Sequence, residues 1–188
     1  MKKYIYQSVV SSVMVLGLMG CATQTQLASK ERHVENGTYQ QGVTAYNEGK
    51  YDKALDILVD VANQGDPAAL NALGMMYQSG KGVSRDVGAA ARLYKKAARA
   101  GLPAAQNNLA VLYEGGEGVP QDLVKAVDLY RRAASQGHVW AQYNLGRLHT
   151  SGVGVAKDDS VAHDWFDQAE NTKALLEEAG QQQIEPGR

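Results

Sequence analysis

One seven-residue pattern, Gly-x-Gly-Val-x-x-Asp, occurs three times in this chain of 188 residues at a constant spacing of 36 residues. Its copies are GKGVSRD at 80–86, GEGVPQD at 116–122 and GVGVAKD at 152–158. A fixed period of this length is typical of repeat proteins, in which each repeat is one supersecondary unit that packs against its neighbours. We therefore divide this part of the chain into three repeats, 66–101, 102–137 and 138–173.

Each repeat is predicted to form two antiparallel helices joined by the seven-residue pattern. In the first repeat, Asp66 followed by Pro67 has the order expected of an N-cap and a first helical residue. The glycines of the pattern are expected to end this helix, its valine to fill the corner, and its aspartate, Asp86, to cap the second helix. In that second helix Tyr94 shares an apolar stripe with several alanines, and Gly101 is expected to end it in the left-handed conformation.

A shorter unit at 38–65 precedes the three repeats. Its Gly42 and Ala54 are 12 residues apart, whereas the matching Gly74 and Ala90 of the first repeat are 16 apart. The difference is the Gly-x-Gly-Val insertion. The stretch AYNEGKYDKAL in this unit strongly resembles the tetratricopeptide repeat family, in which the spacing is 12 residues.

The three longer repeats resemble the Sel-one-like (SEL) repeat family, a relative of the tetratricopeptide family. Its pattern is A-x-x-x-LG-x-x-Y-x-x-G-x-GV-x-x-D-x-x-x-A-x-x-x-Y-x-x-AA-x-x-G. The first repeat meets it at Ala69, Leu73, Gly74, Tyr77, Gly80, Gly82, Val83, Asp86, Ala90, Tyr94, Ala97, Ala98 and Gly101. The resemblance covers roughly residues 38–173. It implies an all-α fold, a right-handed α-solenoid of antiparallel helix pairs with one TPR-like unit and three SEL-like repeats.

The third repeat departs from the pattern at its end, because Lys173 stands where a closing glycine is expected. Terminal repeats are commonly atypical because one of their faces meets water. We expect the last helix to run on into a capping helix at 174–180, followed by a disordered tail at 181–188.

The amino terminus resembles a bacterial lipoprotein signal peptide. Lys2 and Lys3 precede a mostly apolar run, which is too short to be a permanent membrane-spanning helix. Leu18, Gly20 and Cys21 then resemble the lipobox, in which the cysteine is acylated and becomes the first residue of the mature protein. The resemblance implies a signal peptide at 1–20, a lipid on Cys21, and a lipidated flexible tether at 21–37.

The residue after the cysteine indicates where the anchored protein is sent. Ala22 is not an aspartate, so the sorting rule of enteric bacteria implies an outer-membrane lipoprotein that faces the periplasm. Without Lys2 and Lys3 the 19 basic residues become 17 against 20 acidic ones, a net charge near −3. No basic cluster is expected on any predicted face, so nucleic acid is not an expected partner.

The sequence contains no convincing catalytic or metal-binding pattern. Ser160 and His163 are three residues apart on one predicted helix, a spacing that usually leaves both side chains solvated. His149 and His163 are expected to approach each other, but a zinc site needs three or four ligands. We therefore expect no enzymatic activity, no metal and no cofactor.

A partner site is implied by resemblance to tetratricopeptide grooves, in which three positions of each first helix face the concave side. These positions hold Asn71, Ala72 and Met75; Asn107, Asn108 and Val111; and Tyr143, Asn144 and Arg147. All of these except Ala72 are candidate partner-binding residues, since asparagine can pair with a peptide backbone and Tyr143 and Arg147 add a ring and a charge. The alternative is that Asn108 and Asn144 only satisfy neighbouring backbone. The lysines of a carboxylate clamp are missing from these positions.

These features favour a membrane-anchored periplasmic adaptor that binds another envelope protein or peptide. One alternative is a glycan- or peptidoglycan-binding module, in which Trp140 and Tyr143 stack on sugars. A hydrolase is a further alternative. Four units form a short solenoid, so self-association that covers an exposed end is also considered.

Overall fold

The computed structural model describes residues 37–182, and this range folds into eight α-helices. They are α2 (Tyr39–Asn47), α3 (Tyr51–Asn63), α4 (Pro67–Ser79), α5 (Val87–Arg99), α6 (Pro103–Gly115), α7 (Leu123–Ala134), α8 (Val139–Ser151) and α9 (Asp159–Gln182). The predicted signal peptide 1–20, residues 21–36 of the predicted tether with Cys21, and residues 183–188 lie outside the described residues.

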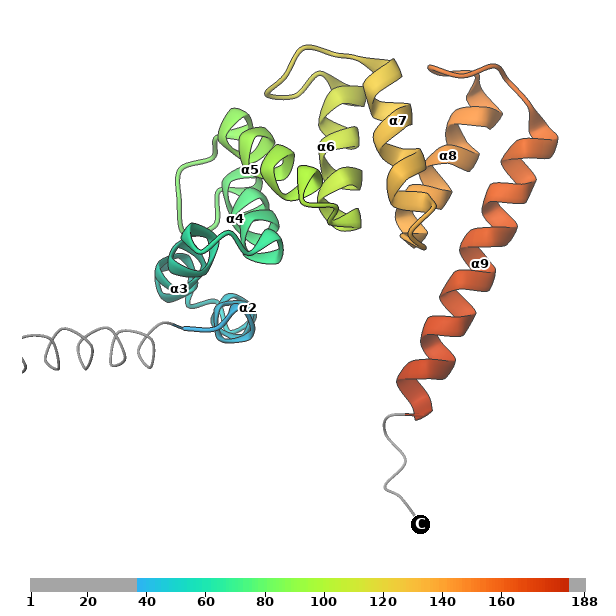
Figure 1. Cartoon of the computed structure of the whole chain (residues 1–188). Helices are drawn as coiled ribbons and strands as arrows, with labels where there is room; N and C mark the ends of the chain where they lie inside the picture. Colours follow the sequence, from blue (N-terminus) through green and yellow to red (C-terminus); the bar gives the residue numbers. More distant parts are fainter. Residues whose placement is uncertain (1–36, 183–188) are drawn as a thin grey trace, which may run out of the picture.

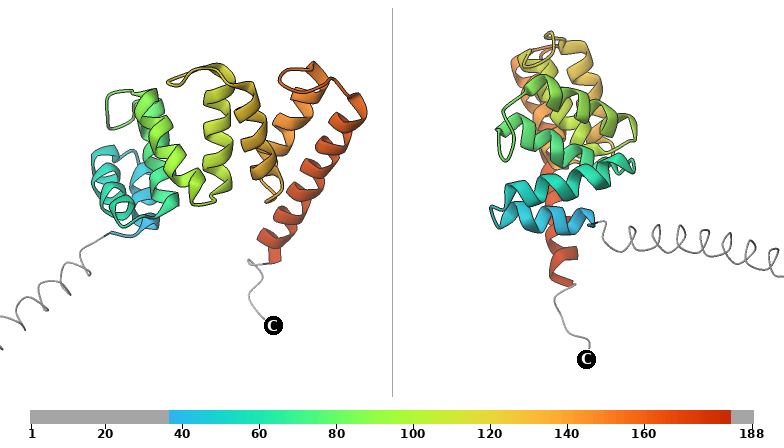
Figure 2. Two further views of the ribbon diagram at one scale, coloured as in Figure 1. Left: turned by 45° about the horizontal axis from the view of Figure 1, so that its top comes forward. Right: turned by 90° about the vertical axis from the view of Figure 1, so that its left-hand side faces the viewer.

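The helices pack as consecutive antiparallel pairs: α2 with α3, α4 with α5, α6 with α7, and α8 with α9. Figure 1 shows the pairs following one another along a curved row, and Figure 2 shows the same row from two other directions. The predicted all-α solenoid of helix pairs is confirmed. Because each pair packs mainly on its sequence neighbours, the three repeats present equivalent positions side by side.

Local sequence accounts for the helix boundaries. Asp66 Oδ1 accepts a hydrogen bond from the Ala69 amide at 2.7 Å, and Asp86 Oδ1 accepts one from the Ala89 amide at 2.8 Å. Each such N-cap contributes about 1 kcal/mol of stability. Gly80 follows α4 with φ of 73°, a left-handed conformation that glycine adopts without a steric penalty.

The core is built from alanines and leucines around two fully buried tyrosines. Tyr94 lies between α5 and α4, where its hydroxyl donates to Gln78 Oε1 at 2.7 Å. Tyr130 lies in the same place in the next repeat, and its hydroxyl donates to Glu114 Oε2 at 2.9 Å. A Cβ atom at Gly74 would stand only 2.5 Å from Cε1 of Tyr94, so the glycine lets the ring pack against the helix backbone.

The carboxyl end of the described residues is one long helix that runs through the segment expected to cap the solenoid. Residues 174–180 belong to the single continuous helix α9, which also includes Gln181 and Gln182, two residues predicted to lie in a disordered tail. The helix continues because Lys173 replaces the glycine that ends α5 and α7 in the left-handed conformation. Its second half projects beyond the other helices (Figure 1).

Candidate functional site

The candidate asparagines bind one another across consecutive repeats. Asn108 Nδ2 donates to Asn71 Oδ1 at 3.0 Å, and one repeat further on Asn144 Nδ2 donates to Asn107 Oδ1 at 3.1 Å. The acceptors Asn71 and Asn107 are buried, and the donors are half-buried. We call these four residues the asparagine ladder. Each link joins two side chains, so it differs from the alternative in which Asn108 and Asn144 bond to neighbouring backbone.

Arg147, predicted to offer a charge to a partner, is already paired. Its Nη2 lies 2.7 Å from Oε1 and 2.8 Å from Oε2 of Glu114 in the preceding repeat. The same carboxylate accepts the hydroxyl of Tyr130. Burial raises the pKa of Tyr130, and the Glu114 carboxylate raises it further. Arg147 therefore joins the second repeat to the third, and the ion pair with Glu114 holds its guanidinium group in place.

The apolar candidates remain available. Met75 and Val111 are 47% and 42% exposed, although both are large apolar side chains. Met75, with Ala72 beside it, lines a hollow of about 160 Å³ at the amino-terminal end of the solenoid. The other walls of that hollow come from Tyr39, Val43, Tyr46, Asn47 and Leu58.

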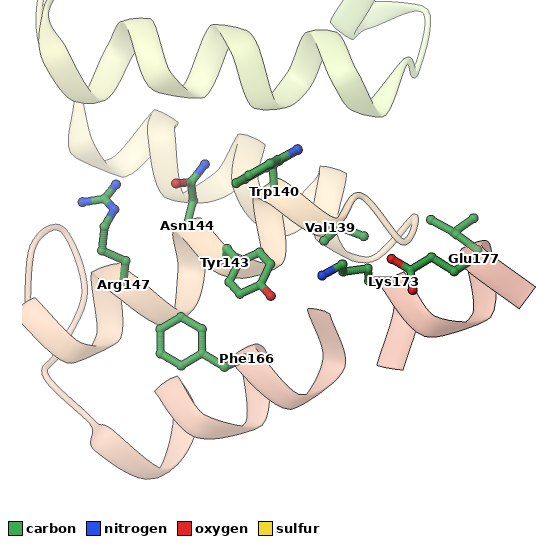
Figure 3. Close-up of a pocket in the computed structure, with 9 residues that line it drawn as sticks. Val139, Trp140, Tyr143, Asn144, Arg147, Phe166, Lys173 and Glu177 are labelled. Carbon is green, nitrogen blue, oxygen red and sulfur yellow. The ribbon is translucent and has the colours of Figure 1, made fainter. Parts of the chain in front are cut away.

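A larger groove, of about 760 Å³, lies between α8 and α9. We call it the aromatic groove; its lining residues are Val139, Trp140, Tyr143, Asn144, Arg147, Phe166, Lys173, Leu176 and Glu177. Figure 3 shows Tyr143 lying between Trp140 and Phe166. The groove thus contains all three candidates of the third repeat.

Three aromatic rings lie in a row along the aromatic groove, each tilted relative to the next by 43–45°. The ring centres of Trp140 and Tyr143 are 6.1 Å apart, as are those of Tyr143 and Phe166. The Tyr143 hydroxyl donates to Glu170, and this hydrogen bond raises the pKa of Tyr143. Trp140 remains 70% exposed, so its ring is presented to solvent at the edge of the groove. Such a surface can bind apolar or planar groups without further rearrangement.

The sequence indicated Tyr143, Asn144 and Arg147 but did not indicate Phe166, Lys173, Leu176 or Glu177 as groove residues. Phe166 occupies the position that Tyr94 and Tyr130 hold in the first two repeats. The other three lie in the extension of α9, and the signal for that extension was Lys173 in place of glycine. The sequence does not predict that this extension passes beside the start of α8.

A second surface corrects the expectation that no predicted face would carry a basic cluster. A hollow of about 240 Å³ between α5, α6 and α7 is lined by Lys95, Arg99, Lys125 and Arg132, with Asp128 as the one carboxylate that lines it. We call it the basic hollow. Its apolar lining consists of Ala98, Leu109, Tyr113 and Leu129. The cations gather there because α6 packs on both α5 and α7, so that side chains of these two helices line one hollow.

Neither surface is arranged for metal chemistry. Among the described residues, no group of three or more histidine, cysteine, aspartate or glutamate side chains is placed to hold a metal ion. His163 is instead accompanied by Asp167 on its own helix, with Nε2 and Oδ2 3.6 Å apart. In the same part of the chain, no helix has both the length and the apolar character needed to span a membrane.

Fold and surface together define a helical-repeat scaffold, a class of protein that presents grooves on a stack of helix pairs. The Sel1 repeat family matches residues 67–102, 103–138 and 141–171, which together make up more than half of the chain. The chain therefore belongs to the Sel1 repeat family.

Two solved structures support the assignment. A Sel1 repeat protein from Oxalobacter formigenes is 36% identical, with a TM-score of 0.67 over 71% of this chain and 53% of that one. The protein c5321, a protective antigen present in uropathogenic Escherichia coli strains and displaying an SLR fold, is 34% identical, with a TM-score of 0.68 over 77% of this chain and 33% of that one. The chain thus spans about half of the first relative and a third of the second. None of the curated proteins matches it.

Proposed function

We propose that this chain is a lipid-anchored scaffold of the bacterial envelope that holds an apolar segment of another envelope protein or peptide in the aromatic groove. The observation that carries the proposal is the groove of about 760 Å³, with Trp140 and Leu176 on its walls. These side chains are 70% and 60% exposed. Large apolar side chains grouped at a groove and left in water are a common feature of binding sites, and tryptophan is often their main anchor.

The charges around the aromatic groove favour an apolar partner over an anionic one. Arg147 is held by both oxygens of Glu114, so its charge is already compensated. Lys173 is accompanied on the same wall by Glu177. A bound carboxylate would have to compete with these groups, whereas an apolar segment gains about 25 cal/mol for each Å² of apolar surface it buries.

The membrane anchor belongs to this proposal and rests on the sequence. Leu18, Gly20 and Cys21 resemble the lipobox, and several acyl chains attached to one cysteine hold a protein on a membrane far more durably than one chain. Cys21 lies outside the described residues. The first described helix, α2, begins at Tyr39, which leaves a polar segment long enough to separate the solenoid from the bilayer. The proposed role is to position a partner at the outer membrane, without catalysis.

Photocrosslinking in living cells tests the proposal. A photoreactive residue replaces Trp140 in the full-length protein, and the crosslinked species are identified by mass spectrometry. The matched control carries the same residue at Val124, which is 78% exposed on α7 and does not line the groove. We expect one dominant envelope protein with the Trp140 variant and not with the control. Equal capture by both variants, or none by either, would contradict binding in the groove.

A second candidate function is glycan binding, and the observation that favours it is the pair formed by Trp140 and Tyr143. Their planes are inclined by 45° with ring centres 6.1 Å apart, and such a surface can stack on sugar rings. In the same experiment this function predicts peptidoglycan fragments, and not a protein, as the adduct at Trp140. Retention on insoluble peptidoglycan that is lost with Trp140→Ala would give independent support.

A further inference from the structure

Among the described residues, nothing packs against the outer face of α9. Asp164, Asp167, Asn171, Leu175 and Glu178 recur every three or four residues, so they share one side of the helix. All five side chains are exposed, and Leu175 is 67% exposed. We call this side the acidic face of α9. It presents three carboxylates and one leucine to solvent.

The second half of α9 is unusual for a helix of a folded domain. Every side chain from residue 173 to residue 179 is exposed. A helical segment of this length gains too little from its own hydrogen bonds to be stable in water, and most helices in proteins are stabilised by packing of one face. A contact that buries Leu175 would supply packing that residues 37–182 do not provide.

The basic hollow has the opposite character. Within the described residues Lys95, Arg99 and Arg132 form no ion pair, whereas Lys125 is held by Asp122 at 2.7 Å. The floor of the hollow is apolar, with Leu109 and Leu129 among its lining residues. Cations around an apolar floor complement a leucine that is flanked by carboxylates.

We propose that the acidic face of α9 docks in the basic hollow of a second copy of this chain. Leu175 enters the hollow, and Asp167 and Glu178 approach the cations contributed by α5 and α7. The contact has to be between copies, because α9 packs on α8 in its own chain and the hollow is formed by the preceding helices. One association thereby covers two surfaces that complement each other in charge and in apolar character.

This contact leaves the aromatic groove open. Leu176 and Glu177 line the groove, whereas Leu175 and Glu178 do not. Self-association is therefore independent of the proposed partner binding, and each can fail without the other.

Sedimentation of purified protein tests the contact, using the chain from residue 21 with Cys21→Ser so that it carries no lipid. We expect reversible self-association at low salt that weakens at about 0.5 M NaCl, where charge interactions are screened within a few Å. A hollow variant carries Lys95→Glu with Arg99→Glu, and a helix variant carries Asp167→Lys with Glu178→Lys. Each is expected to raise the dissociation constant about tenfold or more.

Mixing the two variants gives the decisive measurement. In the mixture, the acidic helix face of the hollow variant meets the basic hollow of the helix variant. The basic helix face of the helix variant meets the acidic hollow of the hollow variant. Association is therefore expected to return. Lys53→Glu with Lys157→Glu is the control of equal charge change, and it should associate like the wild type. Trp140→Ala should do so as well, because it alters only the groove. Circular dichroism confirms that each variant is folded.

A wild-type chain that stays monomeric at low salt would overturn the proposal. Variants that associate as strongly as the wild type would also overturn it. So would a mixture of the two variants that stays monomeric while each variant retains its helicity.

Discussion

At the scale of the residue, one position in the second helix places a buried tyrosine hydroxyl against a polar side chain of the first helix in two of the repeats. Tyr94 and Tyr130 are completely buried, and each hydroxyl is bound by the side chain sixteen residues earlier, Gln78 or Glu114. In the third repeat this position is Phe166, which brings no hydroxyl into the core. In two repeats the buried tyrosine hydroxyl therefore has an acceptor, and the third repeat has no hydroxyl at this position.

The two buried tyrosines are expected to make the fold less stable at alkaline pH. Burial raises the pKa of both Tyr94 and Tyr130 above the ordinary value. The unfolded chain releases these protons from about pH 10 while the folded chain keeps them, so stability is fully present below that pH and falls above it. We expect the free energy of unfolding to fall by up to about 2.7 kcal/mol per pH unit for the pair.

Urea denaturation at several pH values between about 9 and 11 measures that slope. The control is the double variant Tyr94→Phe with Tyr130→Phe, whose absolute stability is lower but whose slope should be shallower. An identical slope in the double variant and the wild type would show that other groups cause the alkaline loss.

At the scale of the element, the distance between paired helices depends on a small residue in the first helix. Gly74 and Gly146 occupy this position in two repeats, and Ala110 occupies it in the other. A Cβ atom at Gly146 would stand 2.5 Å from Cε1 of Phe166, so the ring lies directly on the backbone of α8. This close approach brings α8 and α9 together under the aromatic groove.

Gly146→Ala is therefore expected to lower the free energy of unfolding by about 1–2 kcal/mol, because the ring of Phe166 has to move in a packed core. The matched control is Gly115→Ala, also in a first helix, where the new Cβ would meet only the exposed side chain of Glu117, with Cγ at 3.6 Å and Oε1 at 3.9 Å. That change should leave stability unaltered or raise it by up to about 1 kcal/mol through helix propensity. Chemical denaturation compares the two, and equal effects would refute the packing argument.

At the scale of the whole molecule, the asparagine ladder and the pair formed by Arg147 and Glu114 connect successive repeats, together with the amides of Gln106 and Gln142, which donate to backbone carbonyls of the preceding repeat. A solenoid is stabilised by its individual repeats and by the interfaces between neighbours. Asn108 with Asn71 joins the first repeat to the second, and Asn144 with Asn107 joins the second to the third. These polar links set which atoms of successive first helices lie opposite each other.

A double-mutant cycle on Asn107 and Asn144 measures one link. Each alanine substitution is expected to lower the free energy of unfolding by about 1–2 kcal/mol, since it leaves its partner amide without a hydrogen bond. The coupling energy should be about 0.5–1.5 kcal/mol. Asn71 and Asn144 belong to different links, so the cycle on that pair should be additive. Additivity in both cycles would show that the ladder does not couple the repeats.

Most of the fold could be predicted from the sequence because its determinants are local. An aspartate such as Asp86 caps a helix through an amide three residues away, and Gly80 ends a helix through its own backbone conformation. Both signals recur every 36 residues, so one correct interpretation applied to three repeats. The candidate residues Tyr143 and Arg147 both line the aromatic groove, but the bonds that join Asn107 and Arg147 to neighbouring repeats could not be predicted, because they depend on how the repeats stack.

By itself, the sequence determined the helix pairs, their boundaries and their membership of a repeat family, since each of these depends on residues a few positions apart. Only the tertiary structure decided which side chains of different repeats meet. Asn144 reaches Asn107 across 37 residues of chain, and Arg147 reaches Glu114 across 33. The groove and the basic hollow likewise require helices to be stacked at a particular distance and angle. The packing of the small residues and aromatic rings sets that geometry, and no local pattern specifies it.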